Sequence, residues 1–428
     1  MAKLSSSNGI EKFPKLRFPG FDEPWKEISF SNLFDFLPNN TITRANLSNN
    51  GAIRNIHYGD VLIKFGSVLS IRSDDIPFIK NTDTVNNNVF LKNGDIVIAD
   101  TAEDETVGKV TEIFDIDTEK VVSGLHTIPC RPKKNFAPKF LGYYMNSPAY
   151  HYQLFPLMQG VKVLSISKSN IVGTVIHYPD ILQQTKITNL LSLIDKKISV
   201  QRQLVEALKK YKRGSLSALF PKKGEITPQY RFAGFTKPWE QRKLSEMCGT
   251  FEYGLNAAAK EFDGKNKYIR ITDIDDASRE FLLSDLSSPD ICLDGMSKYL
   301  LSSGDIVFAR TGASVGKTYI YRENDGIVYF AGFLIRAKVN QDNDAEFVFQ
   351  STLSPSYEKY IRITSQRSGQ PGVNAQEYGE YDLFAPSKEE QQRIGHFLRG
   401  IDNLITLYQH KYDILLSLKN ALLQQLFI

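Results

Sequence analysis

A loop punctuated by glycine and proline near residue 370 concentrates side chains that can hydrogen-bond to nucleic-acid bases. It reads Gln-Arg-Ser-Gly-Gln-Pro-Gly-Val-Asn over residues 366–374. Gln and Asn can pair with two edge atoms of adenine in the DNA major groove, and Arg can pair with two edge atoms of guanine. A polar loop without a ligand is the alternative interpretation, since connecting segments are usually exposed. The candidate readers are Gln366, Arg367, Gln370 and Asn374.

A second polar and basic loop lies in the first half of the chain. It reads Gln-Gly-Val-Lys over residues 159–162 and continues through Ser-Ile-Ser-Lys over residues 165–168. Its sequence differs from that of the 366–374 loop, although the segments around both loops repeat. A common scaffold that presents two different reading surfaces would produce this pattern. The candidates here are Gln159, Lys162 and Lys168.

A Gly-Ala-Ser-Val-Gly-Lys-Thr segment at 312–318 resembles a phosphate-binding P-loop. The P-loop pattern needs four residues between its glycines, and this segment has three. The matching segment of the first half is acidic at 103–105, which would repel phosphate. A β-turn, or a basic loop that faces a nucleic-acid backbone, explains the segment better than ATP binding. The candidate backbone contacts are Arg310, Thr311, Lys317 and, in the first half, Lys109.

Catalytic motifs are missing from the sequence. It contains neither an Asp/Asn-Pro-Pro-Tyr/Phe run for amino-methylation of a flipped base nor a glycine fingerprint for a dinucleotide or adenosylmethionine. The three cysteines stand singly and the six histidines are scattered, so no metal site is predicted. Carboxylate clusters of a nuclease remain open, because Asp and Glu are common in loops. The inventory favours recognition without catalysis.

The elements that position these loops occur twice, because the sequence is a tandem duplication. Residues 17–27 read Arg-Phe-Pro-Gly-Phe-Asp-Glu-Pro-Trp-Lys-Glu, and residues 231–241 read Arg-Phe-Ala-Gly-Phe-Thr-Lys-Pro-Trp-Glu-Gln. The Gly-Asp-Ile-Val segment at 94–97 returns at 304–307, and each copy is followed by Val-Gly-Lys. A repeat of this length is too long for a solenoid. It predicts two whole domains related by a pseudo-two-fold axis.

Each half begins with a mixed α/β segment. The apolar runs at 95–99 and 305–309 follow a Gly-Asp turn signal and predict buried strands. The segments at 140–145 and 347–353 predict helices that end before a Ser-Pro pair. We therefore expect two domains of mixed α/β (α+β) class with many loops.

Each half ends in about 40 residues whose apolar positions step alternately by four and three. This spacing is a heptad seam and predicts two long amphipathic helices that pair antiparallel. The alternative is that each helix packs only on its own domain. The predicted helix-pairing residues are Ile187, Leu191, Ile194, Ile198, Val205, Leu208, Ile394, Leu398, Ile401, Ile405, Tyr412 and Leu415, with Gln201 and Tyr408 at the matching polar positions.

The predicted architecture is two globular domains separated by two long antiparallel coiled-coil helices. The first domain covers residues 1–182 and the first helix 183–222, while the second domain covers 223–388 and the second helix 389–428. The first helix carries nine positive charges against Glu206 between residues 196 and 223, which indicates phosphate contact, an acidic partner or a solvated face.

Composition adds few constraints on function. Hydrophobic residues make up 42% of the chain and charged residues 23%, and the formal net charge is +4. No apolar run is long enough for a membrane span, and the N-terminus lacks the features of a signal peptide. We expect a cytoplasmic protein in a reducing compartment, without a membrane partner.

At this point the chain resembles the specificity subunit of a type I restriction-modification enzyme. The resemblance rests on the repeated Arg-Phe-x-Gly-Phe-x-x-Pro-Trp motif, on the Gly-Asp-Ile-Val strand with its Val-Gly-Lys, and on Glu-Glu-Gln-Gln-Arg-Ile at 389–394 with Ile-Asp at 401–402. It covers nearly the whole chain. The first copy departs from the pattern at 181–184, which read Ile-Leu-Gln-Gln, and at Asp100 and the acidic 103–105 segment.

The resemblance implies that each α/β domain is a target-recognition domain that reads one half of a bipartite, asymmetric site on double-stranded DNA. It implies docking of two modification subunits that carry S-adenosylmethionine, and of restriction subunits that use ATP and Mg²⁺, with no cofactor bound by this chain. Adenine-N6 methylation and cleavage would belong to those partners. Two other functions stay open: a self-sufficient DNA methyltransferase or nuclease, and a coiled-coil adaptor that does not bind DNA.

Overall fold

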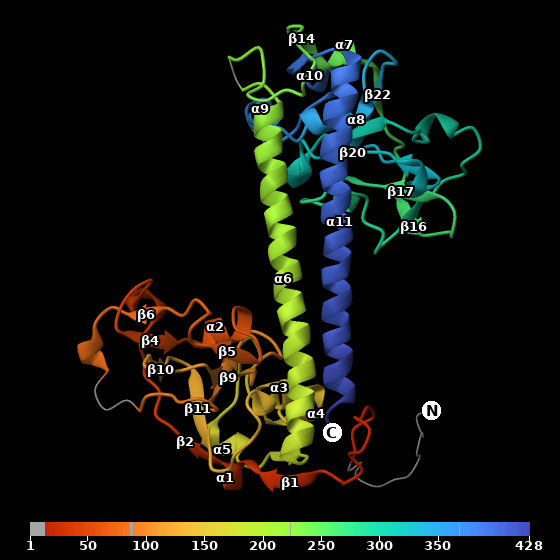
Figure 1. The fold of residues 1–428 in the computed structure, drawn as a ribbon. Helices are drawn as coiled ribbons and strands as arrows, with labels where there is room; N and C mark the ends of the chain where they lie inside the picture. Colours follow the sequence, from red (N-terminus) through yellow and green to blue (C-terminus); the bar gives the residue numbers. More distant parts are fainter. Residues whose placement is uncertain (1–12, 86–88, 223, 368) are drawn as a thin grey trace. The chain divides into compact units, whose positions relative to one another are not determined.

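The computed structural model describes residues 13–85, 89–222, 224–367 and 369–428 (Figure 1). Lys223 of the predicted basic stretch and Ser368 of the predicted reading loop lie outside the described residues. The chain divides into two compact units. Unit 1 comprises Met1–Val200 and Tyr412–Ile428, and unit 2 comprises Gln201–Lys411. Each unit is described by itself.

The core sheet of unit 1 has the strand order β2-β11-β7-β9-β5. Its central strand β7 (Ile96–Ala99) is completely buried, as the apolar run in the sequence predicted. Antiparallel neighbours β11 (Thr127–Pro132) and β9 (Val110–Phe114) flank β7, and Thr127 pairs with Ala99 at the end of the strand. The outer strands are β2 (Phe34–Phe36) and β5 (Val68–Ser70).

A second sheet of unit 1 has the order β10-β4-β6-β3. Its strands are β3 (Leu47–Ser48), β4 (Ile53–Ile56), β6 (Phe78–Ile79) and β10 (Lys120–Ser123). The smaller elements of unit 1 are β8 (Thr101–Ala102), β12 (Leu164–Ser165), α1 (Phe30–Leu33), α2 (Tyr58–Ile63), α4 (Pro148–His151) and α5 (Lys168–Ile171).

The core sheet of unit 2 is antiparallel, with the order β15-β22-β19-β20. Its buried strand β19 (Asp305–Ala309) pairs with β22 (Leu334–Val339), so that Ala309 lies opposite Leu334. β15 (Cys248–Tyr253) and β20 (Thr318–Ile320) form the edges. The smaller elements are β16 (Ala259–Glu261), β17 (Lys267–Ile269), β18 (Ser287–Pro289), β21 (Val328–Phe330), α7 (Leu244–Met247) and α10 (Ala375–Gly379).

The duplication is visible in matching pairs of elements. β1 (Lys26–Ser29) pairs antiparallel with β13 (Val175–Tyr178) in unit 1, and β14 (Glu240–Lys243) pairs antiparallel with β23 (Asp382–Ala385) in unit 2. Both pairs bring the segment that follows a Pro-Trp motif next to the strand that precedes a long helix. The sequence repeat is therefore a repeat of structure.

The predicted helices before the two Ser-Pro pairs are confirmed. α3 spans Phe140–Met145 and α8 spans Ala345–Ser351, two residues earlier than expected because the Asp344 side chain accepts a hydrogen bond from the backbone N–H of Phe347 at 2.8 Å. Each Ser-Pro pair then starts a new helix, α4 and α9 (Pro355–Thr364), with proline in the first turn. Proline is tolerated there because that N–H has no partner within the helix.

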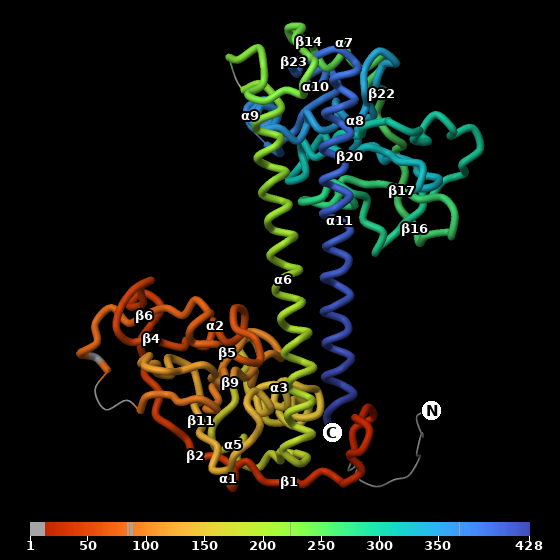
Figure 2. Tube along the Cα trace, viewed as in Figure 1, coloured from red at the N-terminus to blue at the C-terminus, as the bar shows by residue number. Residues whose placement is uncertain are grey.

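Two long helices are the largest elements of the structure. α6 covers Ile181–Leu219 and α11 covers Lys388–Gln425, and Figure 2 traces both as uninterrupted helices. Ile187 and Leu191 are buried in the core of unit 1 together with Leu423, Leu426 and Phe427. In unit 2 the corresponding set is Leu216, Leu219, Phe220, Ile394, Leu398 and Ile401. Each core thus contains the beginning of one long helix and the end of the other.

The helices pair antiparallel within each unit. In unit 2 the amide Nε2 of Gln201 donates to the Tyr408 carbonyl at 2.9 Å, and Lys212 lies beside Asp402, so residue numbers rise along α6 while they fall along α11. In unit 1 Asp195 lies beside Lys419. The predicted fold class is confirmed. The seam has both roles that were considered, since its first residues also pack into the globular cores.

Candidate nucleic-acid interface

The predicted reading loop of unit 2 is fastened to the end of strand β19. The N–H of Val373 donates to the carbonyl of Arg310 at 2.9 Å, and the N–H of Gly312 donates to the carbonyl of Pro371 at 3.0 Å. Thr311 and Gly372 form an isolated β-bridge. The structure therefore brings Arg310 and Thr311 together with the 366–374 loop, which sequence spacing alone did not require.

The side chain of Arg310 is held by two aromatic rings. Its guanidinium lies over the ring of Tyr253 at 5.1 Å and over that of Phe333 at 5.6 Å. Both rings are exposed, at 45% and 56%. Within the described residues the buried Nε of Arg310 has no hydrogen-bond partner. Sequence reasoning missed the two aromatic residues, because one ends β15 and the other precedes β22, far from the loop in sequence.

Gln370 lies close to the turn that follows Arg310. Its Nε2 is 3.0 Å from the position that a Cβ at residue 312 would occupy, so the glycine leaves room for the amide. Gly312 also has a positive φ of 70°, which other residues rarely adopt. The P-loop-like segment itself is a single 3-10 turn, Gly312–Ser314, as the β-turn interpretation expected. Gln366 and Gln370 are exposed.

Three other candidates of unit 2 have partners within the unit. Arg367 forms an ion pair with Glu377 and donates to the carbonyl of Thr364 at 2.8 Å. The side chain of Asn374 caps α10 by accepting from the Glu377 N–H at 2.9 Å. The Lys317 ammonium lies 2.5 Å from Asp276. These contacts fix the shape of the loop and of the turn beside it.

Unit 1 builds the same frame with different side chains. The N–H of Ile166 donates to the carbonyl of Asp100 at 2.9 Å, and Gln159 and Ser165 exchange backbone hydrogen bonds of 3.0 and 2.8 Å. The loop closes over Gly160, where a Cβ would lie 2.0 Å from the Val163 carbonyl oxygen. The side chains of Gln159, Lys162 and Lys168 are exposed. The loop of unit 1 therefore presents a polar and basic surface.

Lys109 is placed differently from the other candidates of unit 1. Its Nζ donates to the carbonyl of Leu62 at 2.5 Å, and burial lowers its pKa, with a smaller contribution from Lys419. The hydrogen bond directs this ammonium toward the backbone of its own unit. The ammonium of Lys168 lies 5.6 Å from the centroid of the Phe36 ring. Lys162 belongs to the exposed segment of the loop, together with Val161, which is 98% exposed.

At the position of Arg310, unit 1 has Asp100. The N–H of Asp100 donates to the carbonyl of His126 at 3.1 Å, just as the N–H of Arg310 donates to that of Phe333 at 3.1 Å. The Asp100 carboxylate Oδ1 lies 3.3 Å from Nδ1 of His126 and accepts from the Thr101 hydroxyl at 2.8 Å. The same backbone position thus carries a cation between aromatic rings in one unit and an anion beside an imidazole in the other.

The long helices are joined to each recognition frame by matching polar contacts. In unit 1 Asp195 accepts from the Tyr143 hydroxyl at 2.7 Å and pairs with Lys419 at 2.6 Å. In unit 2 Asp402 accepts from Gln350 Nε2 at 2.8 Å and pairs with Lys212 at 2.5 Å. The two sets are related residue by residue by a shift of 207 positions, as 195 and 402 illustrate. Each set connects α3 or α8 to both long helices.

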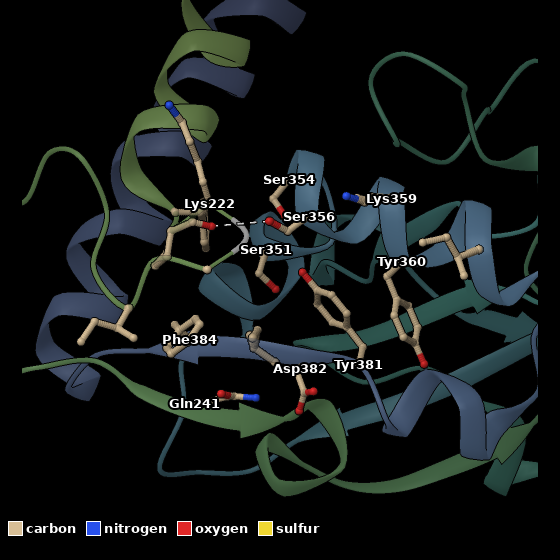
Figure 3. A pocket seen from close by; sticks show the side chains of 16 residues that line it. Lys222, Gln241, Ser351, Ser354, Ser356, Lys359, Tyr360, Tyr381, Asp382 and Phe384 are labelled. Carbon is tan, nitrogen blue, oxygen red and sulfur yellow. Dashed lines mark hydrogen bonds between the residues drawn. The ribbon is translucent and has the colours of Figure 1, made fainter.

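The hollow shown in Figure 3 does not coincide with the reading loop of unit 2. It has a volume of about 560 Å³ and is lined by residues from the segment after α6, from α9 and from β14 and β23, including Lys222, Gln241 and Lys359. One hydrogen bond crosses it, from the Ser356 hydroxyl to the Pro221 carbonyl at 3.5 Å. None of the predicted reading residues lines this hollow.

The described residues show neither a metal-binding cluster nor a membrane-spanning helix. Over the described parts of the chain, no group of three or more His, Cys, Asp or Glu side chains could hold a metal ion. Among the same residues, no helix is both long and apolar enough to cross a membrane.

The two units share a frame and present unlike loop surfaces, and comparison with known proteins shows what the chain is similar to. Residues 236–416 match the type I restriction modification DNA specificity domain. Two curated relatives from Methanocaldococcus jannaschii are each 24% identical to this chain. The MjaVIII specificity subunit of a type I restriction enzyme matches over 260 residues, 58% of this chain, and the protein described as the MjaX specificity subunit matches over 197 residues, 44% of it.

The matched stretches span 60% and 45% of the lengths of these two relatives. Among solved structures, the S subunit of a type I restriction-modification system from M. genitalium has a TM-score of 0.62 at 16% identity, covering 97% of this chain and 99% of that one. A chain solved in work on complex assembly and conformational transition of the type I R-M system has a TM-score of 0.53 at 14% identity, covering 96% and 99%. These likenesses concern the fold.

The resemblance to type I specificity subunits is thereby confirmed. Residues 236–416 are similar to the type I restriction modification DNA specificity domain, and the fold is similar to that of an S subunit over 97% of the chain.

Proposed function

We propose that this chain is the sequence-reading subunit of a type I restriction-modification complex. It binds a bipartite, asymmetric site on double-stranded DNA, with one half-site contacted by each unit. The observation that carries the proposal is the matched position of Asp100 and Arg310, where identical backbone contacts hold side chains of opposite charge. Two identical readers would require a palindromic site, whereas two unlike readers accept an asymmetric one.

The chain acts without chemistry of its own in this proposal. Two modification subunits that bind S-adenosylmethionine dock on it and methylate adenine, and restriction subunits that use ATP and Mg²⁺ complete the complex in the cytoplasm. The absence of catalytic motifs from the sequence supports this division. A self-sufficient methyltransferase would transfer a labelled methyl group from adenosylmethionine to DNA when the purified chain is incubated alone.

Methylome sequencing tests the proposal most directly. Cells that express this chain with its modification partner should show methylated adenines within one bipartite motif. Exchange of residues 223–388 for the equivalent segment of a relative should change one half-site and leave the other unchanged. A change in both half-sites would contradict separate reading by the two units. A purified chain that does not bind DNA even at low salt would contradict DNA binding itself, because phosphate contacts release counterions and bind most tightly at low salt.

We propose further that the length of the long helices sets the gap between the half-sites. Insertion of one heptad into each helix, within 196–211 and within 403–418, keeps the apolar seam in phase. The residues of the two Asp-Lys pairs, 195 with 419 and 212 with 402, lie outside both insertion ranges and are unchanged. Seven residues add about 10.5 Å of helix, which corresponds to roughly three base pairs. The preferred gap should lengthen accordingly in a methylation assay on sites with graded gaps. An unchanged preferred gap would contradict this role of the helices.

A further inference from the structure

Arg310 and Asp100 occupy the same place in the two recognition frames. Each follows the central buried strand of its unit, β19 or β7, and each donates its N–H to the residue that precedes the neighbouring strand, β22 or β11. Each also accepts a hydrogen bond at its carbonyl from the reading loop. Their backbones are therefore fixed by three shared features, while their side chains differ completely.

The Arg310 guanidinium is oriented without being neutralised. The rings of Tyr253 and Phe333 hold it, and no hydrogen bond or ion pair of this group is found within the described residues. The other arginine of this site, Arg367, is paired with Glu377. The Nε of Arg310 is buried, so the donors that a half-buried guanidinium held in this way can offer to a ligand are those of its two terminal nitrogens. Arg also forms two parallel hydrogen bonds with planar acceptors, which Lys cannot do.

The Asp100 carboxylate accepts hydrogen bonds, whereas the Arg310 guanidinium donates them. Its Oδ1 is held by His126 and Thr101, and no partner of Oδ2 is found within the described residues. The ring of Tyr58 packs edge-on against His126 at 5.3 Å. His126 itself has a left-handed backbone with φ of 52°, a conformation uncommon outside glycine. The carboxylate is therefore oriented by a constrained neighbour and keeps one acceptor oxygen for a donor group.

We propose that these two residues are matched base readers of opposite polarity. Arg310 donates to the O6 and N7 acceptors of a guanine in the half-site bound by unit 2. Asp100 accepts from the exocyclic amino group of a cytosine or an adenine in the half-site bound by unit 1. The inference rests on the proposed DNA-reading function and goes beyond it, because it assigns one base-pair position in each half-site to one residue.

The test uses the full chain assembled with its modification partner and a DNA library randomised over both half-sites. Arg310→Gln should lose about 5- to 150-fold of the preference for guanine at one position of one half-site, the range expected for one bidentate base contact. Preferences at the other positions should persist. Asp100→Asn should relax one position of the other half-site, and the base lost there, cytosine or adenine, identifies the amino group that is read.

Arg242→Gln is the matched control, since this arginine lies on β14, outside the reading loop, and pairs with Glu246. It should leave the guanine preference at the Arg310 position intact. Thermal melting of each variant separates loss of reading from loss of folding, and no shift is expected for Arg310→Gln because its guanidinium makes no hydrogen bond in the described structure.

The outcomes of this test are distinguishable. If Arg310→Gln weakens binding to all sequences equally, or if neither variant alters any base preference, the assignment of these readers is wrong while DNA reading by the chain stands. If the unmodified chain itself shows no base preference in the assembled complex, the proposed function fails first.

Discussion

Replacement of Lys212 by methionine should destabilise unit 2 strongly, although it removes one ammonium group and almost no volume. Lys212 Nζ lies 2.5 Å from Asp402, and the two side chains are only 13% and 15% exposed. Without Lys212, the hydrogen bond that remains to the Asp402 carboxylate within the described residues comes from Gln350, at 2.8 Å. Removal of one partner from a buried ion pair costs about 3 to 5 kcal/mol, because a charge remains buried and unpaired.

We expect about 3 kcal/mol for Lys212→Met, at the lower end of that range, because the amide of Gln350 still solvates the carboxylate. For a unit of roughly 200 residues this corresponds to a fall in Tm of about 6 to 12 °C. The measurement is thermal unfolding of the full chain, together with a denaturant titration in which the midpoint moves while the slope stays constant.

Lys209→Met provides the control, one turn earlier on the same helix. Lys209 pairs with Glu206 at 3.2 Å, but the two side chains are 34% and 63% exposed, so its loss should cost less than about 1 kcal/mol. The double variant Lys212→Met with Asp402→Met should recover most of the loss, since it leaves no unpaired charge. If Lys212→Met were as mild as Lys209→Met, the helices would not be held by this ion pair, and the reasoning would be refuted.

Two further predictions concern unit 1. Lys162→Ala should reduce the slope of log affinity for DNA against log salt by about 1, because one phosphate contact is lost. Lys92→Ala changes an exposed lysine near the opposite end of β7 and should leave this slope unchanged in the same salt titration. Burial raises the pKa of Glu112 from 4.5 to about 7, so the folded state binds the proton more tightly and stability should fall by about 3 kcal/mol as pH rises from 4.5 through 7. Melting curves at pH 5 and pH 8 should show this loss of stability for the natural chain and for Glu261→Gln, a control at an exposed carboxyl. An equal loss of stability in Glu112→Gln would contradict the role of Glu112.

Several features of the fold could be predicted because they depend on local spacing. Residues 306–309 are all apolar and follow the Gly-Asp pair at 304–305, and they lie in the buried strand β19. The steps of four and three from Ile187 gave a helix whose seam is buried or half-buried along its length. Proline after serine marked the ends of α3 and α8, because proline disfavours a helical conformation in the residue before it.

Other features depend on contacts between residues far apart in the chain. Phe220, directly after α6, packs into the core of unit 2, and Phe427, shortly after α11, packs into the core of unit 1. No local pattern in the sequence encodes that placement. The pairing of Tyr143 with Asp195 and of Gln350 with Asp402 likewise joins residues about fifty positions apart.

The sequence by itself determined that this protein is a duplication of an α/β domain with a long amphipathic helix, because repeats and periodicity depend on the order of the residues alone. Only the tertiary structure decided which polar side chains remain available for DNA. Lys109, Lys317 and Arg367 satisfy their charge or hydrogen bonds within the protein, whereas Arg310 is held by two aromatic rings from other strands. The physical reason is that a side chain's availability depends on its neighbours in space, and folding chooses those neighbours.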